Sequence, residues 1–147
     1  MAHIPPIVLI AEDDPDEVFL LQRAFSTSGL PCELRFVSNG QQAIDYLSRK
    51  PPYDDDTCQA PFAVVLDLNM PLVGGFEVLE WMNCHPTFKD LPVIIHTTSD
   101  LPSERQRAKQ LGASAYIVKC PLASELGDLF TTIARKTTLG PARPPLQ

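Results

Sequence analysis

A chain of 147 residues with a net charge of −6 can form one domain with a sizeable core, and its acidity argues against nucleic acid or an anionic membrane as the main partner. Hydrophobic residues make up 44% and charged residues 20% of the chain, an ordinary globular composition that argues against disorder. No apolar run approaches the roughly 20 residues that span a bilayer, and the N-terminus lacks a signal peptide's basic and apolar regions. We therefore expect a cytoplasmic protein.

Five short apolar runs predict five buried strands of a parallel sheet. Each run has four or five residues and is rich in Val, Ile or Leu, which is typical of strands covered on both faces. In chain order, the predicted strands are Ile7–Ala11, Glu33–Val37, Ala63–Leu66, Val93–His96 and Ala115–Val118.

Helical patterns with start and stop signals separate these runs. Asp14 and Pro15 are a typical N-cap and first residue of a helix, and Gly29 is a typical stop. The later helices are predicted to begin at Ser38 or Asn39, near Gly75 and near Pro102, and a last one carries the apolar stripe Leu126, Leu129, Phe130 and Ile133.

Alternating strands and helices predict right-handed βαβ units and therefore an α/β fold with a doubly wound five-stranded parallel sheet. The strand order 2-1-3-4-5 fits this pattern and places the switch point between the first and third strands. We expect one domain over residues 1–136, followed by a Pro-rich C-terminal tail over residues 137–147, with no output domain.

Two other features favour structural interpretations. The four cysteines (Cys32, Cys58, Cys84 and Cys120) are scattered without a C-x-x-C pair, so we expect reduced thiols rather than a zinc site or disulfides. The acidic run 54–56 lies in a long Pro-containing loop without further ligands at metal-site spacing, so we expect it to be solvated.

Polar or ionisable residues follow the predicted strands where each one ends. They are Glu12, Asp13, Ser38, Asp67, Thr97 and Lys119. Because ligands of open α/β sheets bind beyond the carboxyl ends of the strands, we expect these side chains to converge. Three carboxylates at such short distances would repel one another. A hard divalent cation such as Mg²⁺, or the Lys119 ammonium, would relieve the repulsion.

This set of groups suits phosphoryl transfer. An ionised Asp67 beside Mg²⁺ could attack phosphorus and form an aspartyl phosphate. Mg²⁺ and Lys119 would neutralise the oxygens of the transferring group, and the Thr97 hydroxyl could hydrogen-bond the product. Each residue alone is a weak signal, and only the order and strand-end placement of the whole set indicate this chemistry.

Four stretches, "IVLIAEDDPDEVFLL", "VVLDLNMPLVGGFEVL", "LPVIIHTTSD" and "LGASAYIVKCP", resemble the receiver domain of two-component response regulators. The resemblance covers about residues 6–136 and implies a flavodoxin-like three-layer sandwich. It implies that Asp67 is the phosphoacceptor, that Asp13 binds Mg²⁺ directly and Glu12 through water, and that Asn69 offers the metal its backbone carbonyl. It further implies that Lys119 pairs with the phosphoryl group, that Thr97 is the switch hydroxyl, and that Tyr116 is the aromatic that swings inward.

The stretches "EDDPDEVFLLQRAF" and "HPTFKDLPVIIHTTS" are similar to stand-alone regulators that partner phytochrome histidine kinases. This likeness implies a cognate histidine kinase of phytochrome type and a homodimer through helix 4, strand 5 and helix 5. It also implies a protein that catalyses only its own phosphorylation and slow autodephosphorylation.

The chain departs from the family pattern after the fifth strand. The family usually has Lys-Pro there with a cis peptide, whereas Cys120 separates Lys119 from Pro121. A cis Lys119–Cys120 bond would cost about 3–4 kcal/mol without proline, so the cis bond is expected either at Cys120–Pro121 or nowhere.

Three alternatives stay open from the sequence. A haloacid-dehalogenase-type phosphatase normally has a second Asp two residues after its nucleophile, where this chain has Asn69. A flavodoxin-like FMN carrier needs a Ser/Thr/Gly-rich loop after the first strand, where Glu12 and Asp13 would repel phosphate. A pseudo-receiver would act only as a protein-interaction module.

Overall fold

The computed structural model describes residues 5–119 and 126–136, which form a five-stranded parallel sheet. The strands are β1 (Ile7–Ala11), β2 (Glu33–Val37), β3 (Ala63–Leu66), β4 (Val93–Thr97) and β5 (Ala115–Val118). Their order is β2-β1-β3-β4-β5, and every neighbouring pair is parallel. The predicted fold class and strand order are therefore confirmed, and β4 extends one residue beyond its prediction, to Thr97.

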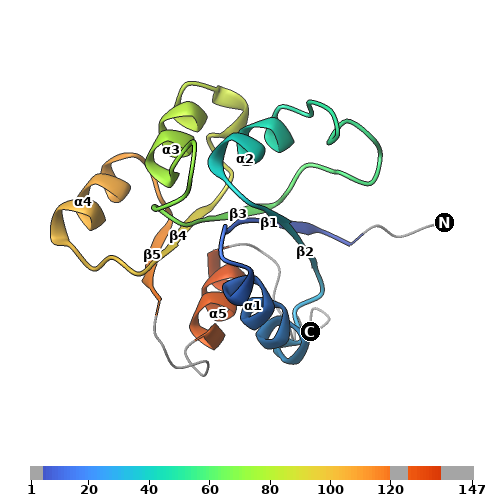
Figure 1. Ribbon diagram of the computed structural model, residues 1–147, viewed down its shortest axis with the longest axis horizontal. Coiled ribbons are helices and arrows are strands. Elements are labelled where there is room, and N and C mark those ends of the chain that lie inside the picture. Colours follow the sequence, from blue (N-terminus) through green and yellow to red (C-terminus); the bar gives the residue numbers. More distant parts are fainter. Residues whose placement is uncertain (1–4, 120–125, 137–147) are drawn as a thin grey trace, which may run out of the picture.

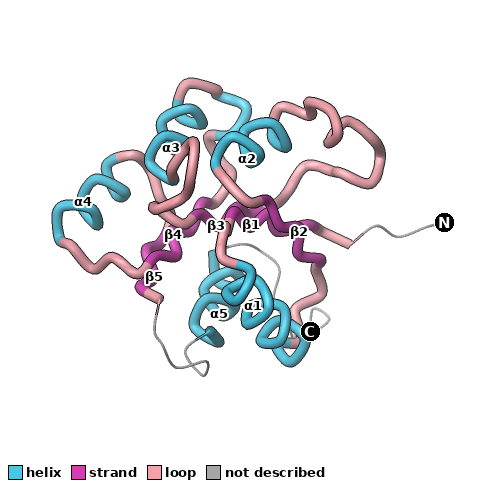
Figure 2. The backbone as a smooth tube through the Cα atoms, viewed as in Figure 1, coloured by secondary structure: helices cyan, strands magenta, loops and turns pink. Residues whose placement is uncertain are grey.

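Helices cover both faces of the sheet, which gives three layers. They are α1 (Pro15–Ser28), α2 (Gly40–Leu47), α3 (Gly75–Asn83), the 3₁₀ turn η1 (Pro86–Phe88), α4 (Pro102–Gln110) and α5 (Leu126–Lys136). In Figure 1, α1 and α5 lie below the sheet and α2, α3 and α4 lie above it. Figure 2 shows the magenta strands as one continuous layer between the two sets of cyan helices.

Local sequence signals set the helix boundaries as expected. Asp14 caps α1, since its Oδ1 accepts a hydrogen bond from the Asp16 amide at 2.9 Å, and Gly29 ends the helix with a left-handed φ of 76°. For α2, Asn39 rather than Ser38 is the N-cap, because its Oδ1 accepts from the Gln42 amide at 2.8 Å.

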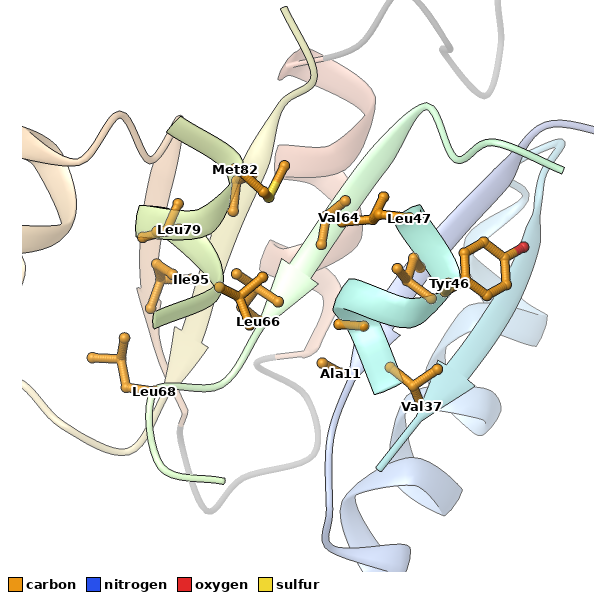
Figure 3. Close-up of a cluster of buried hydrophobic side chains, with 14 of the residues drawn as sticks. Ala11, Val37, Tyr46, Leu47, Val64, Leu66, Leu68, Leu79, Met82 and Ile95 are labelled. Atoms are coloured by element: carbon orange, nitrogen blue, oxygen red, sulfur yellow. The ribbon is translucent and has the colours of Figure 1, made fainter. Parts of the chain in front are cut away.

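Two apolar clusters hold the layers together. Alternating strand residues point to opposite faces, so Leu9 and Ala11 pack towards α2 and α3, whereas Val8 and Ile10 pack towards α1 and α5. Figure 3 shows the first cluster, in which Leu66 lies among side chains from neighbouring strands and α3. Each fully buried Leu or Ile contributes about 1.5–3 kcal/mol, so the sheet is a rigid platform for the residues at its carboxyl edge.

Glycines allow two close backbone approaches beside that edge. A Cβ at Gly75, the first residue of α3, would lie 2.5 Å from the backbone oxygen of Asp67. A Cβ at Gly40 would lie 2.3 Å from the backbone oxygen of Val73. The connection from β3 to α3 can therefore pack tightly only because both positions lack a side chain.

The long loop before β3 is locally ordered by hydrogen bonds. Asp55 Oδ1 accepts from the Thr57 amide at 2.8 Å, and Arg49 donates to the backbone oxygen of Cys58 at 2.7 Å. A cis peptide joins Pro51 and Pro52.

The expectations for the cysteines and for the C-terminal tail concern residues both inside and outside the described ranges. Cys32, Cys58 and Cys84 are free thiols, in line with the prediction for these three. Cys120, the Cys120–Pro121 peptide and the tail 137–147 lie outside the described residues. None of the helices in the described ranges is both long and apolar enough to cross a bilayer.

Candidate functional site

Three carboxylates meet at the carboxyl edge because β1 and β3 are neighbours. Ala11 lies opposite Leu66, so Glu12 and Asp13 leave β1 at the level where Asp67 leaves β3. One carboxylate oxygen from each of these three residues lies within 4.8 Å of the others. Glu12 and Asp67 are 4% and 7% exposed, whereas Asp13 is exposed, so the cluster is open to solvent on one side only.

Lys119 follows the carboxyl end of β5, and its side chain extends to this cluster. Its Nζ donates to Glu12 Oε1 at 2.6 Å and to Asp67 Oδ2 at 2.9 Å, and its side chain is 7% exposed. The backbone fixes its starting point, because the Lys119 amide donates to the Thr97 carbonyl at 2.6 Å. A single buried ammonium therefore bridges two carboxylates that come from different strands.

The electrostatics of the cluster follow from burial and this ion pair. Burial raises the pKa of Glu12 above its ordinary value, although the hydrogen bond and charge of Lys119 act in the opposite direction. Burial alone would lower the pKa of Lys119, but the hydrogen bonds and charges of Glu12 and Asp67 outweigh it and raise that pKa. Lys119 is thus held as an ammonium.

The donor set fits a hard divalent cation. Three carboxylates against one ammonium leave two negative charges uncompensated when all are ionised, and all three residues offer oxygen ligands within 4.8 Å of one another. Mg²⁺ prefers such ligands and commonly keeps waters beside one or two carboxylates. Asn69 lies next to the cluster and is exposed, and its amide donates to Asp67 Oδ1 at 3.2 Å.

Thr97 and Tyr116 both contact Ser99, in the loop between β4 and α4. Thr97 is fully buried, and its Oγ1 accepts from the Ser99 amide at 3.4 Å. Tyr116 is half-buried, and its hydroxyl donates to the Ser99 carbonyl at 3.0 Å. Ser99 had not been singled out from the sequence, where it is one of several polar residues after the strand.

His96 is a second residue that the sequence interpretation missed. It precedes Thr97 in β4 and is 3% exposed, and its Nδ1 has no hydrogen-bond partner among the described residues. Burial and the charge of Lys119 lower its pKa from 6.5 to about 4, against an opposing effect of Asp67. The sequence feature that could have identified His96 is an imidazole at the end of an otherwise aliphatic run.

Comparison with known proteins places this geometry in a family. The family model described as the response regulator receiver domain matches residues 8–131. The chain belongs to this family. The predicted recognition is therefore confirmed, and the carboxylate cluster lies in a receiver domain.

Relatives and solved structures agree with this assignment. The chain is 32% identical over 132 residues to a probable methanogenesis regulatory protein, FilR2, of Methanothrix harundinacea, covering 90% of this chain and 81% of the relative. It is similar to the phosphorylated cyanobacterial phytochrome response regulator RcpA, with a TM-score of 0.81, 29% identity, and coverage of 93% of this chain and 95% of that one. It is also similar to the Mn²⁺-bound form of the response regulator Rcp1, with a TM-score of 0.79, 28% identity, and coverage of 88% and 91%.

Proposed function

We propose that this receiver domain is a phosphorylation switch that accepts a phosphoryl group on Asp67 from a phosphohistidine of a histidine kinase. The observation that carries the proposal is the buried Asp67 carboxylate, held between a buried ammonium and two further acids. A carboxylate activated in this way is a typical nucleophile for acyl phosphate formation.

In the proposed transfer, an oxygen of Asp67 bonds to phosphorus as the phosphorus–nitrogen bond of the donor breaks. The electron pair of that bond goes to the imidazole nitrogen. Lys119, already 2.9 Å from Asp67 Oδ2, would pair with the new phosphoryl oxygens. Its two present contacts hold the ammonium in place, so little reorganisation is needed during the reaction.

The metal ligands that we propose are Asp13, Asp67 and the backbone carbonyl of Asn69, with Glu12 acting through water. Bound Mg²⁺ would supply positive charge next to the transferring group. The Mn²⁺-bound form of Rcp1, a similar protein, and the close approach of the carboxylate oxygens support this assignment.

We propose that the charge added at Asp67 shifts the protein between two states. The Thr97 hydroxyl would leave Ser99 and donate to the phosphoryl group, and Tyr116 would reorient with it. Such a change is a population shift biased by local electrostatics. The present contacts of both residues with Ser99 support a shared response.

The partners that we propose follow from the similarity of this chain to phytochrome response regulators. RcpA is a phytochrome response regulator and has been observed phosphorylated, which supports a phytochrome-type kinase as the donor for this chain. We propose that downstream partners, including a second copy of this chain, contact the surface of α4, β5 and α5, and that the protein acts in the cytoplasm. Catalysis would be limited to its own phosphorylation and slow autodephosphorylation.

The complete acidic cluster with its lysine does not favour a pseudo-receiver, because such a module would not need a buried ammonium between two carboxylates. Asn69 likewise argues against a phosphatase that needs a second Asp at this position.

Incubation with Mg²⁺ and acetyl phosphate, followed by intact mass measurement, tests the proposal. We expect a gain of one phosphoryl group in the parent protein and in Asp55→Asn, which changes an exposed carboxylate outside the cluster. We expect no gain in Asp67→Asn. An unmodified parent protein, or an equally modified Asp67→Asn variant, would refute the proposal.

A further inference from the structure

Ser99 joins the two proposed switch residues through its own backbone. Its amide donates to Thr97 Oγ1 at 3.4 Å and its carbonyl accepts from the Tyr116 hydroxyl at 3.0 Å. The Ser99 hydroxyl donates to Glu104, in the first turn of α4, and accepts from the Leu101 amide at 3.3 Å. A displacement of Ser99 would therefore disturb Thr97, Tyr116 and the start of α4 together.

Arg105 holds Tyr116 by a separate contact. The guanidinium carbon of Arg105 lies 4.7 Å from the centroid of the Tyr116 ring, which is within the range of a cation–π interaction. Asp100 fixes this guanidinium, since Arg105 Nη2 lies 2.6 Å from Asp100 Oδ1. The loop between β4 and α4 therefore binds the Tyr116 hydroxyl directly through Ser99, and it contacts the ring indirectly, through the ion pair of Asp100 with Arg105 of α4.

Packing does not fix the Tyr116 ring on every side. A groove of about 540 Å³ lies between α4 and β5, and its lining includes Arg105, Lys109, Ala115 and Tyr116. The groove leaves one side of the ring without packed neighbours, so the Ser99 and Arg105 contacts add to its packing against the first apolar cluster in holding the observed orientation.

We propose that Arg105 is a positioning residue for Tyr116, and that the guanidinium and the Ser99 carbonyl together couple the orientation of the ring to the state of the Thr97 loop. A displaced loop would break the Ser99 hydrogen bond and, through Asp100, disturb the Arg105 contact as well, whereas loss of the guanidinium alone leaves the Ser99 hydrogen bond as the remaining link and weakens the coupling. This inference deepens the proposed function, but its first step concerns the unphosphorylated protein and does not require phosphorylation.

Incorporated fluorotyrosine and ¹⁹F NMR report this orientation directly. The chain contains three tyrosines, and Tyr116→Phe identifies the resonance to follow. In Arg105→Ala we expect the ratio of the two ring orientations to change by roughly two- to fivefold, the bias of one exposed cation–π contact, with an intermediate change in Arg105→Lys.

Arg107→Ala is the matched control, because it removes the same charge from the same helix. Arg107 lies 4.3 Å from the Phe76 ring centroid and 3.5 Å from Glu80, and we expect it to leave the Tyr116 resonance unchanged. An unchanged Tyr116 resonance in Arg105→Ala, or an equal change in Arg107→Ala, would overturn the proposal.

A second measurement addresses coupling after treatment with Mg²⁺ and acetyl phosphate. At equal phosphorylated fractions, determined by intact mass, we expect phosphorylation to displace the Tyr116 resonance less in Arg105→Ala than in the parent. An equal displacement in both proteins would refute the coupling. If no protein gains a phosphoryl group, the proposed function fails, and the first measurement still decides whether Arg105 positions Tyr116.

Discussion

Replacement of His96 by Leu should change how the free energy of unfolding depends on pH. The imidazole is 3% exposed, and its Nδ1 lacks a partner among the residues that the structure describes. Lys119 disfavours its protonation and Asp67 favours it, but burial is the largest effect. Leucine fills a similar volume without a titratable group, so the substitution removes this proton linkage.

The sign and size of the effect follow from the pKa in the two states. The pKa of His96 falls from 6.5 to about 4 on folding, so the unfolded chain binds more protons between these values. The folded protein therefore keeps the full stability associated with neutral His96 above pH 6.5 and loses it as the pH falls towards 4. A difference of 2.5 pH units corresponds to about 3 kcal/mol.

Urea unfolding at pH 7 and at pH 4 in EDTA measures this effect. We expect the parent to lose about 3 kcal/mol more than His96→Leu over this interval. Glu12, whose pKa is raised by burial, titrates in both proteins and cancels in the comparison. Parallel stability curves for the two proteins would show that the His96 pKa is not lowered by folding.

Three further predictions concern the acidic cluster and the backbone beside it. Lys119→Met should lower the free energy of unfolding in EDTA by about 3 kcal/mol, because it leaves the buried Glu12 and Asp67 without a cation. In urea unfolding, Mg²⁺ should stabilise this variant more than the parent, and an equal gain of stability in both proteins would contradict the prediction. Asp13→Asn should weaken Mg²⁺ binding in calorimetry on the order of tenfold, whereas Asp54→Asn should not, and an unchanged affinity in Asp13→Asn would exclude it as a ligand. Gly40→Ala should cost about 1–3 kcal/mol because its Cβ would lie 2.3 Å from the Val73 oxygen, and a stability equal to that of the parent would show that this connection can relax.

The fold was predictable because its signals are local and periodic. Aliphatic runs of strand length, Asp14 before Pro15, and Gly29 after an apolar stripe each report a boundary that short-range sterics and hydrogen bonds determine. The strand order followed from the handedness of βαβ connections rather than from any single residue.

The convergence of the acids and Lys119 was also predictable, since parallel strands end at the same edge of the sheet. The contacts of Ser99 and Arg105 were not, because they depend on side-chain and loop conformations between β4, α4 and β5 that have no periodic signature. His96 was overlooked because one imidazole in an aliphatic run still fits a strand, and its burial depends on helices far away in sequence.

Chemical trapping of the modified residue tests the central claim most directly. Borohydride reduces an aspartyl phosphate to homoserine, which peptide mass spectrometry locates by residue. After treatment with Mg²⁺ and acetyl phosphate, we expect homoserine at position 67 and no reduced side chain at any other acidic position. Trapping at Glu12 or Asp13, or no trapped residue in a protein that has gained a phosphoryl group, would contradict it.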